Sequence, residues 1–273
     1  MTTSNANEGG HGYVSVDGLD LYYETHGRDT GTPLVLLHGA LSTIGVDFGR
    51  VLPALAETRR VIGVEQQAHG HTADIDRPLS YRQMADDTAA LLRQLGIEQA
   101  DLFGYSLGGA VAMQVAMRHP GLVRKFVAAG GTSYRPDGLY PEMLGGMKDL
   151  KPEHLAGTEF EQAYARTAPN PENWPALIEK VKELDLRLEG WSPEEIQAIQ
   201  APALLMIGDS DIVKPEHTAE MFRLLGGGVP GDIAGLPRSR FAVLPGTTHI
   251  TLMHRADWLV PMVTEFLDAK APA

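Results

Sequence analysis

The chain lacks cysteine and is poor in positive charge. Of its 273 residues, 23 are lysine or arginine and 35 are aspartate or glutamate, which gives a formal net charge of −12. Without cysteine there can be no disulfide, no thiol nucleophile and no thiolate metal ligand. The excess of negative charge argues against nucleic acid or an anionic membrane as a partner, because binding to phosphates requires a positive field.

Long apolar runs are also missing, so the sequence predicts neither a membrane span nor a signal peptide. Residues 1–11 are polar and are expected to form a flexible tail, and a cytoplasmic location is the expectation. Hydrophobic residues make up 43% of the chain. That content is enough for one large core, or for a core with an inserted subdomain.

The hydrophobic pattern predicts a mostly parallel sheet whose strands alternate with helices. Residues 12–16 and 19–25 alternate apolar and polar positions around Asp17-Gly18, which indicates an antiparallel hairpin. The later apolar runs are continuous, as in strands buried on both faces of a parallel sheet. These six strands are expected at 33–37, 60–64, 101–105, 123–129, 203–207 and 241–244. Helices are expected at 47–58, 80–95 (opened by a capping box of Ser80 and Gln83), 107–119, from Glu216, and at 257–268.

The stretch 134–200 has a different character. It carries many prolines, charged helical fragments and scattered large apolar residues, and no buried strand pattern. We interpret it as a helical cap subdomain inserted into a core domain formed by residues 12–133 and 201–270. Its large apolar side chains are expected to be divided between the cap's own small core and a pocket beneath it.

A serine at a sharp strand-to-helix turn is predicted in the segment 101–110. The motif Gly104-Tyr-Ser106-Leu-Gly108 places glycines two residues before and two residues after the serine. Such a turn strains the serine backbone, and side chains at the glycine positions would collide with neighbouring elements. The N–H of Leu107, at the start of the helix, would then point toward negative charge that develops near the hydroxyl.

A serine hydroxyl becomes a good nucleophile when a base lies within hydrogen-bond reach, and an imidazole suits that task near neutral pH. His249 ends the motif Pro245-Gly-Thr-Thr-His249, which follows the last predicted strand. It should therefore lie at the same edge of the sheet as Ser106. Two carboxylates, Asp209 and Asp211, follow the preceding strand, and both are available to orient the imidazole.

Residues 12 to 268 resemble the α/β-hydrolase superfamily, and within it the capped bacterial esterase and lactonase branch. The resemblance is carried by four motifs in the family's order: Leu36-Leu-His38-Gly39, Gly104-Tyr-Ser106-Leu-Gly108, Gly208-Asp-Ser-Asp211 and Pro245-Gly-Thr-Thr-His249. It implies an α/β-hydrolase fold, with a mostly parallel eight-stranded sheet, helices on both faces and an inserted helical cap.

The resemblance also implies roles for single residues. Ser106, Asp211 and His249 would form a catalytic triad in that chain order. In the family the acid usually falls three residues after the glycine that closes its strand, which selects Asp211 over Asp209. In some members the acid follows the earlier strand, which makes Asp137 an alternative. The backbone N–H groups of Leu107 and Ala40 would form the oxyanion hole.

Other histidines are expected to have structural roles. His38 is expected to support the oxyanion loop, and His254 belongs to the approach to the final helix. His69 and His71 lie where the family commonly has Asp-x-Arg-Gly-His-Gly, a pattern from which Glu65, Gln67 and Ala68 depart. We interpret this segment as a structural loop near the pocket. The spacing of His69 and His71 is a weak metal signal, and no metal and no cofactor is expected.

The substrate is expected to be a small-molecule ester or lactone that reacts with water, and the oligomeric state, monomer or homodimer, is open. The first hypothesis is a carboxylic ester hydrolase for small to medium esters, and the close alternative is a lactonase acting on an acyl homoserine lactone or another cyclic ester. Perhydrolase and C–C hydrolase activities, or a non-catalytic ligand-binding module, are further alternatives. The side chains expected to line the substrate pocket are His38, Leu41, Tyr105, Tyr134, Tyr140, Met143, Met147, Trp174, Val213 and Ile250.

Overall fold

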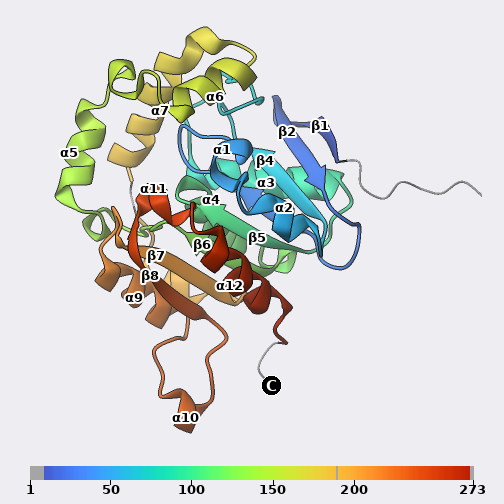
Figure 1. Ribbon diagram of the computed structural model, residues 1–273, viewed down its shortest axis with the longest axis vertical. Helices are drawn as coiled ribbons and strands as arrows, with labels where there is room; N and C mark the ends of the chain where they lie inside the picture. Colours follow the sequence, from blue (N-terminus) through green and yellow to red (C-terminus); the bar gives the residue numbers. More distant parts are fainter. Residues whose placement is uncertain (1–8, 189, 271–273) are drawn as a thin grey trace, which may run out of the picture.

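The computed structural model describes residues 9–188 and 190–270, and an eight-stranded sheet runs through the molecule (Figure 1). The spatial order is β1-β2-β4-β3-β5-β6-β7-β8. β2 pairs antiparallel with β1 and β4, and the other neighbours pair parallel. The expected fold class is therefore confirmed. The strands are β1 (Gly10–Val16), β2 (Leu19–His26), β3 (Leu34–Leu37), β4 (Val61–Glu65), β5 (Ala100–Tyr105), β6 (Val123–Ala129), β7 (Ala203–Ser210) and β8 (Arg240–Thr248).

The first two strands form the expected hairpin. Asp17 and Gly18 have φ values of 48° and 81° and connect the facing residues Val16 and Leu19. A two-residue turn with positive φ at both positions matches the right-handed twist of the strands it joins. The local sequence therefore determines the register of this edge of the sheet.

Helices cover both faces of the sheet, and β3 shows how its side chains serve the two cores. Leu34 and Leu36 belong to the hydrophobic core that contains side chains of α1, α2 and α12, whereas Val35 and Leu37 belong to the core with α3 and α4. This alternation follows from the two-residue period of a strand. The helices outside the segment between β6 and β7 are α1 (Ile44–Phe48), α2 (Leu52–Ala56), α3 (Tyr81–Gln94), α4 (Leu107–Arg118), α9 (Pro215–Leu224), α10 (Gly231–Ala234), α11 (His249–Leu252) and α12 (Ala256–Asp268), with a 3₁₀ turn at Pro120–Leu122.

Between β6 and β7 the regular structure of the described residues is helical. Three of these helices, α5, α6 and α7, lie together over one end of the sheet, whereas α10 projects from the opposite end (Figure 1). The segment comprises α5 (Pro141–Asp149), α6 (Glu159–Thr167), α7 (Trp174–Leu186) and α8 (Pro193–Gln197), with 3₁₀ turns at Pro136–Gly138, Pro152–Leu155 and Pro171–Asn173. The boundaries 134–200 of a separate cap subdomain stay a prediction.

Four local expectations differ from the structure. Of the flexible tail expected over residues 1–11, residues 1–8 lie outside the described residues, whereas Gly10 and His11 belong to β1. The helix expected over 47–58 is two short helices, α1 and α2, separated around Gly49. The capping box at Ser80 is half formed: Ser80 accepts the N–H of Gln83, but the Gln83 side chain binds Asp87 instead of reaching back. The last strand, expected at 241–244, extends to Thr248, so the four motif residues that precede His249 belong to β8.

None of the helices in the described part of the chain has the length and apolar character needed to cross a lipid bilayer.

Candidate active site

Ser106 sits at a strained turn between β5 and α4. Its backbone has φ 53° and ψ −117°, a conformation that an L-residue rarely adopts. The flanking glycines are required by close approach: a Cβ on Gly104 would collide with the carbonyl of Gly108, and one on Gly108 would collide with the carbonyl of Leu37. The tight packing of β3, β5 and α4 therefore fixes the serine at the carboxyl end of the sheet.

A chain of two hydrogen bonds connects Ser106 to a buried carboxylate. Nε2 of His249 lies 3.0 Å from the Ser106 hydroxyl, and its Nδ1 lies 2.8 Å from Oδ1 of Asp211. Because an ionised carboxylate can only accept, Nδ1 carries the proton and Nε2 is free to accept from the serine. The Tyr105 hydroxyl donates to the backbone carbonyl of His249 at 3.0 Å, which holds the histidine in place.

The two candidate acids have different surroundings. The Asp211 side chain is buried, and besides His249 it accepts N–H groups from Gly208 and Ile212. The exposed Asp209 accepts the N–H groups of Gly246 and Thr247 and so holds the strand that leads to His249. The structure therefore brings Asp211, and not Asp209, to the imidazole. The other alternative, Asp137, forms an ion pair of 2.7 Å with Arg135.

The loop after β3 is held beside Ser106 by buried polar groups. Nε2 of His38 accepts the N–H of Gln66 at 3.0 Å, so its Nδ1–H donates to the Gly39 carbonyl at 2.7 Å. The N–H of Gly39 donates to Asp47, 2.7 Å away, and Ser42 donates to the other Asp47 oxygen. Burial raises the pKa of Asp47, and these donors oppose the rise. The result is a rigid loop that presents Ala40 to the cavity of Ser106.

The cavity at Ser106 is small, about 60 Å³. Core residues form its floor, and residues of the segment between β6 and β7 form much of its wall. Ala40 and Leu107, the two residues expected to supply oxyanion N–H groups, both line it. The complete lining is Ala40, Tyr81, Ser106, Leu107, Ala110, Gly131, Thr132, Ser133, Leu139, Met143, Asp185, Leu188 and Ile212.

The pocket side chains expected from sequence are mostly elsewhere. Met143 lines the cavity, whereas Tyr134 is fully buried and stacks on His217, and Trp174 packs against Tyr164. The reason is that a small helical layer needs most of its large apolar side chains for its own core. The other nine expected residues lie outside this lining: His38, Leu41, Tyr105, Tyr134, Tyr140, Met147, Trp174, Val213 and Ile250.

Sequence reasoning missed four polar members of the cavity, Tyr81, Thr132, Ser133 and Asp185. Asp185 did leave a signal in the sequence: it follows Ile178 by seven residues and Val181 by four, so it lies on the apolar face of α7. An acidic residue in that position is unusual enough to mark a site. Tyr81 and Ser133 left no comparable signal.

The loop with His69 and His71 lies outside the cavity lining. Burial lowers the pKa of His69 to about 3, and its Nδ1 bonds the Gln67 carbonyl. The hydrogen bond to Glu65, at 2.8 Å, raises the pKa of His71. Across residues 9–188 and 190–270, no three His, Asp or Glu side chains gather as ligands for a metal ion.

Comparison with known proteins agrees with the fold. Residues 32–172 match the family model described as the alpha/beta hydrolase fold. An uncharacterised hydrolase of Bacillus subtilis is 24% identical over 93% of this chain and 96% of its own. The crystal structure of carboxylesterase CesB from Bacillus subtilis covers 96% of this chain and 92% of its own at 18% identity, with a TM-score of 0.71. The enol-lactonase from Burkholderia xenovorans covers 94% and 100% at 21% identity, with a TM-score of 0.70.

The matched segment is more than half of the chain, so the chain belongs to the α/β-hydrolase family, and it is a serine hydrolase. The match includes Ser106 and the loop before α1 but ends before Asp211 and His249. Those two residues are placed by the hydrogen bonds described above and not by the family match. The solved structures share the fold at low identity, and they do not distinguish an ester from a lactone as the substrate.

Proposed function

We propose that the protein hydrolyses small carboxylic esters through an acyl-Ser106 intermediate. The observation that carries the proposal is the continuous hydrogen-bonded path from the strained Ser106, through His249, to the buried Asp211, at the wall of a cavity. His249 takes the proton of Ser106 as the hydroxyl oxygen attacks the ester carbonyl, and then gives it to the departing alkoxide. Water, activated by the same imidazole, releases the acid.

Asp211 holds the imidazole in the tautomer that can accept from Ser106 and stabilises the imidazolium that forms. The N–H groups of Ala40 and Leu107 would bind the oxyanion of the tetrahedral intermediate. The small cavity favours short acyl groups, because about 60 Å³ is far below the hundreds of Å³ typical of sites for drug-sized ligands. A lactone is the second candidate substrate: the fold is shared with an enol-lactonase, and a small ring keeps its acyl and alcohol parts in one compact molecule.

A substrate panel tests the proposal. Purified protein is assayed with p-nitrophenyl acetate, butyrate and octanoate beside γ- and δ-lactones, and each rate is compared with that of Ser106→Ala. We expect hydrolysis that depends on Ser106 and falls as the acyl chain lengthens. Rates equal to those of Ser106→Ala on every ester and lactone would refute the proposal and favour a ligand-binding role.

A further inference from the structure

An acidic side chain reaches the cavity of Ser106 from α7. Asp185 lies in the last turn of that helix and lines the cavity together with Ser106 and Met143. The hydroxyl of Tyr81, at the start of α3, donates to Oδ1 of Asp185 at 3.0 Å. A carboxylate and a phenol from two different parts of the chain therefore meet beside the nucleophile.

The cations on the same helix have other partners. Lys180 binds Asp74 at 2.7 Å, Lys182 binds Glu179 at 2.9 Å, and Arg187, just beyond the helix, lies 3.7 Å from Glu183. Removing a carboxylate from water without supplying a counter-charge costs free energy. Burial raises the pKa of Asp185 to about 6, against the opposing effect of the Tyr81 hydrogen bond and the nearby His249. At pH 7 to 8 the group is mostly ionised, and its charge is available to a ligand.

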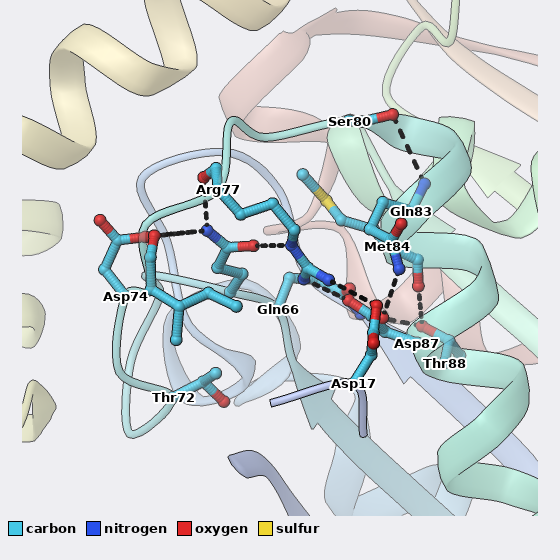
Figure 2. Close-up of polar contacts among 12 residues, drawn as sticks. Asp17, Gln66, Thr72, Asp74, Arg77, Ser80, Gln83, Met84, Asp87 and Thr88 are labelled. Carbon is cyan, nitrogen blue, oxygen red and sulfur yellow. Dashed lines mark hydrogen bonds and ion pairs between the residues drawn. The ribbon is translucent and has the colours of Figure 1, made fainter. Parts of the chain in front are cut away.

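The position of α7 over the cavity is fixed at a second point. The ammonium of Lys180 donates to the Asp74 carboxylate and, at 3.0 Å each, to the carbonyls of Ile75 and Arg77. Arg77 in turn extends from this loop to Asp87 on α3, as Figure 2 shows, at 2.6 Å. Contacts at both ends of the helix segment 180–185 thus hold the Asp185 carboxylate in a defined place, which a selective site requires.

We propose that Asp185 is the residue that determines substrate selectivity, by binding an ammonium group of the ester substrate and excluding esters that carry a carboxylate. The inference rests on the proposed function of Ser106. The rest of the lining is apolar, hydroxyl or backbone in character, so Asp185 supplies its fixed charge at neutral pH. An ammonium group would replace the missing counter-charge and form a charge-assisted hydrogen bond or ion pair. The net charge of −12 would also attract cationic substrates to the protein.

A neighbouring cavity of about 230 Å³ carries basic residues, and it shares Tyr81 and Leu188 with the cavity of Ser106. Its cations are compensated: Lys180 and Arg187 have the partners given above, and Arg82 lies 3.7 Å from Glu195. These pairs supply little net positive charge to oppose a cationic substrate. Among residues 9–188 and 190–270 no cation forms an ion pair with Asp185, so its carboxylate is the stronger influence on what binds at Ser106.

Two series of matched esters test the charge preference in both halves of the substrate. For the acyl half, the substrates are ethyl 3-aminopropanoate, its neutral isostere ethyl butanoate, and monoethyl succinate. For the alcohol half, they are acetylthiocholine and its carbon isostere 3,3-dimethylbutyl thioacetate. The thioesters can be followed with a thiol reagent without background from the protein, because the chain has no cysteine. The quantity compared is the ratio of kcat/KM for the charged ester to that for the neutral one.

In the wild-type protein we expect a cation preference in at least one series and the lowest kcat/KM for monoethyl succinate. Asp185→Asn should lower the cation-to-neutral ratio on the order of 10- to 100-fold, as loss of a charge-assisted contact predicts. Glu179→Gln is the matched control, because it removes the same charge from the exposed side of the same helix, outside both cavity linings, and should leave the ratio unchanged. Tyr81→Phe keeps the carboxylate and should retain the cation preference.

The ratio separates this role from two others. If Asp185 served only to hold α7 against Tyr81, or only to stabilise the protonated His249, Asp185→Asn would reduce kcat/KM for both esters and leave their ratio unchanged. That result in both series would overturn the inference while hydrolysis of the neutral esters by Ser106 still stood. Absence of any Ser106-dependent hydrolysis would instead refute the proposed function.

A measurement on the wild-type protein keeps the inference testable if Asp185→Asn does not fold. The charge of acetylthiocholine does not change with pH, so its ratio to the carbon isostere should rise between pH 5 and 7 as Asp185 ionises around its pKa of about 6. Tyr81 and His249 are the titratable groups that act on Asp185 from α3 and α11. Tyr81 stays neutral, because burial raises its pKa well above the usual value. Both thioesters need the same neutral imidazole of His249 as the base, so this requirement cancels in their ratio. A ratio that is flat over this range would overturn the inference.

Discussion

Two serine–histidine–carboxylate arrays lie close together in this molecule, and both of their serines line the same cavity. In the first, Ser106 lies 3.0 Å from Nε2 of His249, which bonds Asp211. In the second, Ser133 lies 2.9 Å from Nε2 of His217, whose Nδ1 is 4.0 Å from Glu220. Judged by the serine-to-imidazole distance alone, the two are equivalent.

The two arrays differ in the other hydrogen bonds that the serine hydroxyl and the imidazole nitrogen form. Nε2 of His217 also accepts the N–H of Tyr134 at 3.2 Å, and the Ser133 hydroxyl lies 2.6 Å from the Arg135 carbonyl. The imidazole lone pair is therefore already used in joining the loop after β6 to α9, and the serine proton is used within that loop. Ser106, by contrast, stands at a strained turn with helix α4 beginning at the next residue. A hydrogen bond to histidine thus marks a nucleophile only where the lone pair is free and backbone donors stand beside it.

Removing the two serines in turn should show the largest contrast. We expect Ser106→Ala to lower kcat/KM for p-nitrophenyl acetate by about 10⁴- to 10⁶-fold, because the attacking atom is lost. Ser133→Ala should cost less than about tenfold, as expected for a cavity residue outside the chemistry. An organophosphonate should label the peptide that contains Ser106, as mass spectrometry can show. Labelling of Ser133, or equal losses of kcat/KM in the two variants, would contradict the assignment of the nucleophile to the first array.

The acids of the first array give the next largest contrast. Asp211→Asn should reduce kcat by about 10⁴-fold, because the amide no longer favours the tautomer with the proton on Nδ1. Asp209→Asn removes a carboxylate two residues away that bonds backbone N–H groups, so it should cost stability more than turnover. Steady-state kinetics and urea unfolding on the same samples separate the two effects. A larger loss of kcat in Asp209→Asn would reverse our assignment.

The parts of the site that lie outside the segment between β6 and β7 could be predicted from sequence because their causes are local. The elbow at Ser106 needs glycine where the backbones approach closest, and this need leaves a readable motif. His249 and Asp211 each follow a strand, and the carboxyl ends of parallel strands meet at one edge of the sheet. The preference for Asp211 over Asp209 came from family resemblance, and the structure supplies its physical reason: one carboxylate is buried at the imidazole, and the other is exposed on a turn.

The cavity wall could not be predicted, because it depends on how helices without strong motifs pack together. Trp174 and Tyr134 have the residue types of a pocket, yet both are used in packing. Asp185 has the residue type of a solvent-exposed position, yet it reaches the cavity, because it lies on the same face of α7 as the buried Ile178 and Val181. The break between α1 and α2 is a similar case, since the periodicity across 47–58 gave no sign of it.

The second array is best tested through stability. His217→Ala leaves the buried N–H of Tyr134 without its acceptor, so the free energy of unfolding at pH 7.5 should fall on the order of 2 kcal/mol. His254→Ala, at an exposed histidine, is the matched control and should change it by less than about 0.5 kcal/mol. Urea unfolding followed by circular dichroism measures both. An unchanged stability in His217→Ala would mean that the array does not hold the loop after β6.

The smallest expected effect is the pH dependence of the difference in free energy of unfolding between the wild type and His217→Ala. Burial lowers the pKa of His217 below its usual value near 6.5, so at lower pH the unfolded chain binds more protons at this position than the folded one. The stabilisation that His217 provides is therefore complete above that value and is lost as pH falls, and the gap between wild type and His217→Ala should narrow from pH 7.5 to pH 5. The buried His69 has the same direction of shift in both proteins and cancels in the difference. A gap that widens instead would show that His217 is protonated in the folded state and paired with Glu220, which would make the second array resemble the first more closely than its hydrogen bonds suggest.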